Sequence, residues 1–256
     1  MRIIPFNDTF FICILFCLLI FLTITFFFKD KSEKTRKIVL LSYCGLNLIL
    51  FIIYKINLST NPATLVDKGY VFNIWEELPL HLCNISLFLV PISVLINNKK
   101  LLSYGFYIAP LGAIMAVCFP DPSFIGESIF EFYNIGYYFT HLNIVIVGLL
   151  LVSLKLFKPT FKQLLFLNIY AGCIGVVMHF VNLILRALTS ADVNYFYTIN
   201  TSGISLLNLF WSIIPVPLLY LVFALAILNV YAALVTLPFH LYIKRKNKLE
   251  NNLVCE

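Results

Sequence analysis

The sequence predicts an all-α integral membrane protein, a bundle of transmembrane helices that forms a single domain over residues 1–256. The chain is 61% hydrophobic and only 12% charged, and its mean hydropathy is +0.94. A typical water-soluble domain carries about 25% charged residues. Seven apolar runs each approach the roughly 20 residues that cross a bilayer as a helix. They are continuous rather than alternating in polarity, which favours helices over a barrel.

The seven crossings are expected at residues 10–28, 37–57, 78–96, 101–119, 137–157, 161–188 and 212–243. The first run ends FFFKD with no small-residue cleavage pattern, so we expect a retained helix and not a signal peptide. Gly105, Pro110 and Gly112 interrupt the fourth run, and Pro215 and Pro217 lie near the start of the seventh. We expect kinks at both places.

The third crossing is preceded by the polar stretch WEELPLHLCN, Trp75 to Asn84. Asn73 with Glu76 three residues later resembles a capping box, and Pro79 either kinks the helix or starts it. Charges at helix starts are usually structural, so we expect Glu76 and Glu77 to be solvated caps.

The basic residues predict the orientation, because short basic loops stay on the cytoplasmic side. Fourteen of the 18 lie in the loops and tail of one side: Lys29, Lys31, Lys34, Arg36, Lys37, Lys99, Lys100, Lys155, Lys158, Lys162, Lys244, Arg245, Lys246 and Lys248. The N-terminus is therefore expected outside and the C-terminus inside. The net charge of +6 follows from this asymmetry and suits anionic lipid, so we do not expect a nucleic-acid partner.

The longer loops lie on the opposite, outer side at residues 58–77, 120–136 and 189–211. Long loops over one end of a bundle usually shape an opening, so we expect a functional site there. The seven cysteines contain no CxxC pair, which argues against a zinc ribbon. Cys83 and Cys118 fall near outer helix ends and could be a disulfide, a nucleophile with a bystander, or two packing residues.

Three histidines on three predicted helices, His81, His141 and His179, share one depth in the outer leaflet. Ionisable groups inside a membrane protein are costly, which favours a shared site. His81 and Cys83 are two residues apart, about 200° around a helix, so a histidine from another helix is the better partner for Cys83. The histidines could serve a Cys83 nucleophile, form a tri-histidine zinc centre, or only tie helix ends together.

The motifs LPLHLC from Leu78, THL around His141, MHF around His179 and VNYFY from Val193 resemble those of the YwaF-like bacterial integral membrane proteins. These resemble the animal transmembrane protein one hundred and sixty-four, a cysteine- and histidine-dependent acyltransferase that moves acyl chains between phospholipids. The resemblance runs from about the third helix to the seventh and implies a multi-pass protein of the bacterial plasma membrane.

Carried over by position, the resemblance implies functional roles for His81, His141 and His179, and for the loop dipeptide Asn194 and Tyr195. The nucleophile of the animal relative falls on Leu80 of this chain. Cys83 is one helical turn deeper and about 60° away, so it could substitute for that nucleophile, or this branch uses no cysteine.

Three functions remain open. The first is a lipid acyltransferase or hydrolase in which Cys83 attacks an ester, His141 or His179 activates it, and His81 or Asn194 stabilises the oxyanion. In this reading Asn84, Asn194 and Tyr195 contact the substrate, and the partners are phospholipid and lysophospholipid. The second is a metal-dependent hydrolase with the three histidines as ligands. The third is a non-enzymatic bundle that binds or transports a ligand. The oligomeric state is left open.

Overall fold

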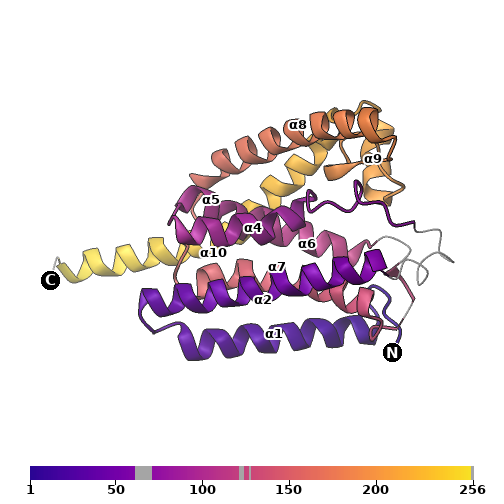
Figure 1. Ribbon diagram of the computed structural model, residues 1–256. Helices are drawn as coiled ribbons and strands as arrows, with labels where there is room; N and C mark the ends of the chain where they lie inside the picture. The colour runs from indigo at the N-terminus through magenta and orange to yellow at the C-terminus, as the bar shows by residue number, and fades with distance from the viewer. Residues whose placement is uncertain (61–70, 121–123, 127, 255–256) are drawn as a thin grey trace.

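The computed structural model describes residues 1–60, 71–120, 124–126 and 128–254. Its long helices lie side by side as a bundle (Figure 1). Six helical segments are long and apolar enough to cross a membrane: Asp8–Phe28, Glu33–Thr60, Lys99–Cys118, Phe132–Ser153, Gln163–Thr189 and Leu219–Tyr242. Within the described residues there is no strand, only an isolated bridge between Arg2 and Ser128.

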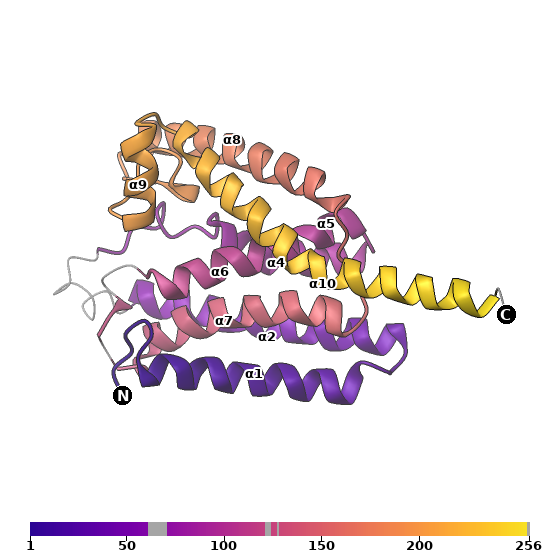
Figure 2. The ribbon, with the colours of Figure 1, turned by 180° about the vertical axis from the view of Figure 1, so that it is seen from behind.

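The first two helices, α1 (Asp8–Phe28) and α2 (Glu33–Thr60), form an antiparallel hairpin on one side of the bundle (Figures 1 and 2). The side chain of Asn7 caps α1 by accepting a hydrogen bond from the backbone N–H of Phe10 at 2.9 Å. Both helices pack on α7 (Phe132–Ser153), which is among the most enclosed segments. The apolar runs predicted at 10–28, 37–57 and 137–157 therefore form helices whose ends differ by a few residues.

The third predicted crossing, 78–96, differs from the structure. Here α4 (Leu82–Leu95) has 14 residues, about 21 Å at 1.5 Å per residue and shorter than a bilayer core of about 30 Å. Residues 71–81, which include Pro79, are irregular, and the helix starts only after His81. Six long helices and this shorter apolar one thus stand where seven full crossings were predicted.

The fourth predicted crossing is a continuous but kinked helix. It consists of α5 (Lys99–Ser103), a π-helical turn η1 (Tyr104–Ile108) and α6 (Ala109–Cys118). Because Pro110 has no N–H, the regular bonding pattern fails there, and the wider turn lets the N–H of Ala109 reach the carbonyl of Tyr104. A kink was predicted near Pro110, and the structure has a π-helical turn directly before it.

The last predicted helix, 212–243, begins later than expected, and a separate short helix forms mostly within the predicted loop 189–211. A short helix α9 (Ser205–Ile213) ends before Pro215, and the turn η4 (Leu219–Leu221) leads into α10 (Val222–Val254). Together with α8 (Gln163–Thr189), α10 forms a layer that leans away from α6 toward the end where α9 lies (Figure 2). The predicted kink near Pro215 and Pro217 is thus a complete break in the helix.

The basic loops gather at one end of the bundle. Lys155 pairs with Asp30 at 2.8 Å, Arg36 donates to the carbonyl of Leu154 at 2.7 Å, and Lys99 donates to that of Leu156 at 3.0 Å. At the opposite end the backbone N–H of Gly126 bonds the carbonyl of Ile3. The predicted grouping of loops is present in the described residues, and the side of the membrane that each end faces stays a prediction.

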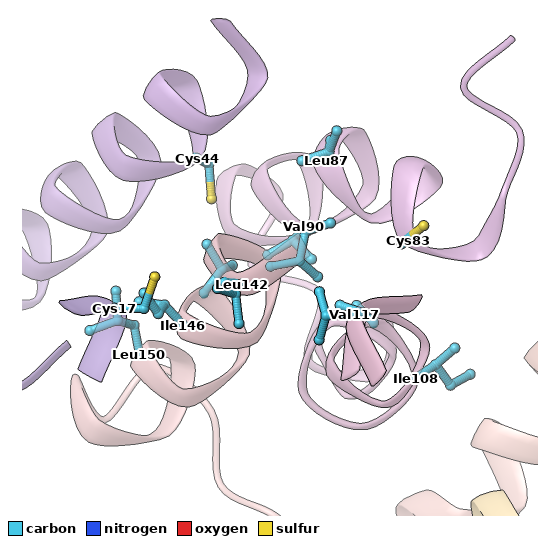
Figure 3. Close-up of a cluster of buried hydrophobic side chains, with 14 of the residues drawn as sticks. Cys17, Cys44, Cys83, Leu87, Val90, Ile108, Val117, Leu142, Ile146 and Leu150 are labelled. Carbon is cyan, nitrogen blue, oxygen red and sulfur yellow. The ribbon is translucent and has the colours of Figure 1, made fainter. Parts of the chain in front are cut away.

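Two hydrophobic clusters make up the core. The larger joins α1, α2, α4, α6 and α7, and Figure 3 shows Cys17 and Cys44 among its apolar side chains, with Cys83 at the first turn of α4. The smaller contains Ala191, Val193 and Tyr195, packed against Leu78 and Leu80 and against the last turns of α8. The stretch from Leu78 to Cys83 therefore bridges the two clusters.

Candidate functional site

Cys83 lies in the first turn of α4, where the irregular segment becomes helical. His81 is the N-cap residue, with extended backbone, and its carbonyl accepts the hydrogen bond of Ile85 N–H at 2.9 Å. The predicted capping box at Asn73 forms a turn and not a helix start: its side-chain amide donates to Glu76 Oε1 at 3.0 Å. Cys83 is 9% exposed. Cys83 and Cys118 are both free cysteines, so the predicted alternative of a disulfide between them is not formed.

His141 on α7 meets Cys83. Its Nε2 lies 3.3 Å from the Cys83 sulfur, and its Nδ1 lies 2.7 Å from the backbone carbonyl of Tyr137, one turn earlier on the same helix. A carbonyl oxygen can only accept, so Nδ1 carries the proton. In the neutral ring Nε2 is then a lone-pair acceptor that faces the thiol, which is the arrangement of a nucleophile with its general base.

Two tyrosines fix the helices that carry this pair. The hydroxyl of Tyr137 donates to the carbonyl of Ala116 at 2.8 Å, and its ring stacks on Phe124 with centroids 4.2 Å apart. The hydroxyl of Tyr104 donates to the carbonyl of Leu82 at 2.7 Å. These bonds tie α7, which carries His141, and α4, which carries Cys83, to the Lys99–Cys118 helix.

Asn84, one of the predicted substrate-binding residues, is buried beside the thiol. Its Oδ1 lies 3.8 Å from the Cys83 sulfur, longer than the contact to His141. The backbone N–H groups of Cys83 and Asn84 belong to the first turn of α4. N–H groups in the first turn of a helix have no partner within it, and they carry the positive end of the helix dipole.

His81 is held between aromatic rings of the loop after α8. Its ring centroid lies 5.1 Å from that of Tyr195 and 5.7 Å from that of Tyr197. Both tyrosines belong to the short turn η3 (Tyr195–Tyr197). His81 is thus close to Cys83 in sequence, but its ring packs against the loop that carries Tyr195 and Tyr197.

Tyr195 joins this loop to the segment before α4. Its hydroxyl donates to the carbonyl of Trp75, and its N–H donates to Asn182 Oδ1 on α8 at 2.8 Å. Burial raises the pKa of the Tyr195 phenol, so it stays a hydrogen-bond donor at neutral pH. Asn194 donates within the loop, to Asn200 Oδ1 and to Ser202 Oγ at 2.8 Å each. Its amide therefore organises the loop itself.

An ion pair near the site escaped the sequence prediction. Lys55 of α2 pairs with Glu77, and the two side chains are only 22% and 17% exposed. The ammonium also lies 5.0 Å from the Tyr54 ring centroid. Glu77 is thus a largely buried partner and not the solvated cap that was expected. The signal was a lysine in the last turn of the predicted crossing 37–57, where a charge is costly without a partner.

His179 lies on α8, apart from the Cys83 and His141 pair. In the described part of the chain its Nδ1 is buried without a hydrogen-bond partner, and its ring is 6.2 Å from that of Phe180. Among the residues that the structure describes, no group of three or more His, Cys, Asp or Glu side chains could hold a metal ion. The tri-histidine centre of His81, His141 and His179 stays an untested prediction.

The chain was compared with known proteins and families. The model of the TMEM164 family matches residues 5–236. No curated protein and no solved structure matches the chain. The match covers all six long helices of the bundle except the end of the last, and it includes both partners of the Cys83 and His141 contact.

Proposed function

The chain belongs to the TMEM164 family of membrane proteins, and from this premise we propose that it transfers acyl chains of membrane lipids, with Cys83 as nucleophile and His141 as general base. The observation that carries the proposal is the 3.3 Å contact between His141 Nε2 and the Cys83 sulfur. The Nδ1 bond to Tyr137 leaves Nε2 free to take the thiol proton. The sequence resemblance to acyltransferases supports the same chemistry.

In the first half-reaction His141 Nε2 takes the proton of the Cys83 thiol while the sulfur attacks the carbonyl carbon of a lipid acyl ester. The bond between that carbon and the glycerol oxygen breaks, and His141 returns the proton to the departing oxygen. A lysolipid leaves, and the acyl chain remains on Cys83 as a thioester.

In the second half-reaction the hydroxyl of an acceptor lysolipid gives its proton to His141 and attacks the thioester carbonyl. The carbon–sulfur bond breaks, and the sulfur recovers the proton from His141. If water takes the place of the lysolipid, the same steps make the protein a hydrolase.

Both half-reactions pass through a tetrahedral oxyanion. We assign its stabilisation to the backbone N–H groups of Cys83 and Asn84, because both lie in the first turn of α4, where N–H groups have no partner within the helix. His81 stands two residues earlier, at the N-cap of the same helix. The Asn194 amide, the other predicted donor, is engaged within its own loop.

The proposal is tested with purified protein in vesicles that contain a phospholipid with an isotope-labelled acyl chain and an unlabelled lysophospholipid. Mass spectrometry follows the labelled chain to the lysophospholipid, to free fatty acid, or to Cys83 as a hydroxylamine-labile adduct. Removing a general base typically costs about 100-fold to 10,000-fold, so His141→Ala is expected to lose activity on that scale and Cys83→Ala to lose the adduct as well.

Cys44→Ala is the matched control, because Cys44 is also a buried cysteine of the core, 5% exposed, on α2. It is expected to retain wild-type activity. Equal transfer by wild type and Cys83→Ala would eliminate the thioester route. If Cys83→Ala is active while His141→Ala is not, the site works through histidine alone.

A further inference from the structure

The short helix α9 lies crosswise to the bundle. It connects α8 to α10 at the end of the molecule opposite the basic loops, and it runs across the direction of both helices (Figures 1 and 2). If α8 and α10 cross a membrane, a crosswise helix at their ends lies along the membrane plane. Its sequence SLLNLFWSI contains no charged residue.

The side chains of α9 divide into three strips. Phe210 is buried, 6% exposed, and packs on Phe223 of α10 with centroids 5.4 Å apart. Leu209 and Ile213, four residues apart on another face, are 58% and 60% exposed. The polar residues Ser205, Asn208 and Ser212 follow a third line along the helix, and all three are exposed.

The exposed apolar strip continues onto the next segments of the chain. Val216, Leu219 and Val222 are 43%, 60% and 50% exposed and lead into the apolar segment Leu219–Tyr242. The exposed apolar residues of α9 are therefore followed along the chain by those of a candidate membrane-spanning helix. Trp211, with its ring 5.2 Å from that of Tyr220, is a residue type enriched at membrane interfaces.

We propose that α9 is an interfacial helix that rests on the lipid surface, with Leu209 and Ile213 among the acyl chains and the Ser205, Asn208 and Ser212 line in water. Phe210 then faces the protein. A helix with protein, lipid and water on three separate sides is stable only near the boundary between headgroups and acyl chains. Moving it into water would expose both aliphatic side chains, and moving it deeper would bury its polar line.

This position has a structural consequence for the loop beside His81. The hydroxyl of Tyr220, in the turn after α9, donates to the carbonyls of Tyr197 and Asn200, and the N–H of Leu218 donates to the carbonyl of Thr198 at 2.8 Å. The loop that carries Tyr195 and Tyr197 is thus fastened to the chain that leaves α9. Lipid contact at α9 holds that loop in place from its far side.

The test uses tryptophan fluorescence in vesicles, because Trp75 and Trp211 are the two tryptophans of the chain. In a Trp75→Phe, Trp211→Phe background, Ile213→Trp and Ser212→Trp place one reporter each on neighbouring residues about 100° apart around α9. Ser212 and Ile213 are both exposed, so either ring is accommodated. The quenchers are phospholipids brominated on the acyl chain, either near the headgroup or near the chain end, and iodide loaded on both sides of the vesicles.

Ile213→Trp is expected to be quenched several-fold more by lipid brominated near the headgroup than by lipid brominated at the chain end, and little by iodide. Ser212→Trp is expected to be quenched mainly by iodide and little by either brominated lipid. Equal responses of the two reporters, or strongest quenching from the chain end, would overturn the proposal. Protection of Ile213→Trp from both quenchers would also overturn it, because a second protein surface would then cover the strip.

Discussion

His141 faces Cys83 in one tautomer only, because a backbone carbonyl cannot donate a hydrogen bond. The Tyr137 carbonyl accepts a hydrogen bond from Nδ1–H at 2.7 Å, and no side-chain substitution at position 137 removes that carbonyl. The orientation of the base therefore depends on the helical geometry of α7 rather than on a third side chain such as an aspartate. This differs from the usual nucleophile triads, where a side chain orients the histidine.

The sequence identified both members of this contact but not their pairing. His141 and Cys83 are 58 residues apart, and periodicity does not say which helices become neighbours. His179 was an equal candidate for the same reason, since it shares the predicted depth. The Tyr137 carbonyl and the Lys55–Glu77 pair were missed, because a backbone acceptor leaves no residue-type signal and the pair joins a helix to an irregular segment.

The Lys55–Glu77 pair predicts a difference between buried and exposed ion pairs. Lys55→Met removes the cation beside a carboxylate that is 17% exposed, and breaking a buried pair costs about 3–5 kcal/mol. Lys155→Met breaks the Lys155–Asp30 pair, whose side chains are 63% and 69% exposed, where about 0–1 kcal/mol is expected. Thermal unfolding in detergent should show a clearly lower Tm for Lys55→Met and little change for Lys155→Met.

The double variant Lys55→Met, Glu77→Gln separates this loss from simple loss of packing. It removes both charges, so its Tm is expected above that of Lys55→Met alone. Equal Tm values for the single and double variants would mean that the charge of Glu77 does not matter to the fold.

At the scale of elements, α2 and α7 approach each other most closely at Gly136. A Cβ placed there would lie 2.4 Å from the Tyr54 Cβ, which belongs to the stem of a side chain and cannot swing away. Gly136 also directly precedes Tyr137, whose carbonyl orients His141. The spacing of these two helices and the orientation of the base therefore depend on one glycine.

Gly136→Ala is accordingly expected to destabilise the protein by about 1–3 kcal/mol through overpacking. Gly172→Ala is the matched control, since Gly172 is also in the middle of a long helix and a Cβ there meets nothing within 4 Å. Replacing that glycine should leave Tm unchanged or raise it slightly, because alanine favours helix. Parallel melting curves settle the comparison, and an unchanged Tm for Gly136→Ala would contradict the close packing of α2 on α7.

The predicted elements were most accurate in two apolar runs that are free of proline. The runs at 10–28 and 161–188 correspond to α1 and α8 almost residue for residue. The errors occurred near Pro79, where α4 starts later than expected, and near Pro215 and Pro217, where the last long helix also starts later and α9 forms in a predicted loop. Hydropathy counts apolar residues but does not say where a helix begins, whereas Pro91 and Pro238 lie inside intact helices.

At the scale of the whole molecule, the distribution of basic residues predicts which end faces the cytoplasm. The loops with Asp30, Leu154 and Leu156 meet at the basic end, whereas the Cys83 site and α9 lie toward the other. Under the positive-inside rule the site opens toward the outer leaflet. A lipid substrate would then be drawn from that leaflet, and cytoplasmic thiols or enzymes would not reach the loop over His81.

This orientation can be tested with single cysteines introduced at exposed positions of the two ends. Ser32 lies in the basic loop between α1 and α2, and Ser202 lies in the loop before α9; both are exposed. In a background whose seven native cysteines are replaced by serine or alanine, a membrane-impermeant maleimide applied to intact cells should label Ser202→Cys and not Ser32→Cys. Permeabilised cells should show labelling of both, because each side chain is solvent-accessible. The opposite pattern in intact cells would place the site on the cytoplasmic side and reverse the predicted source of its lipid substrate.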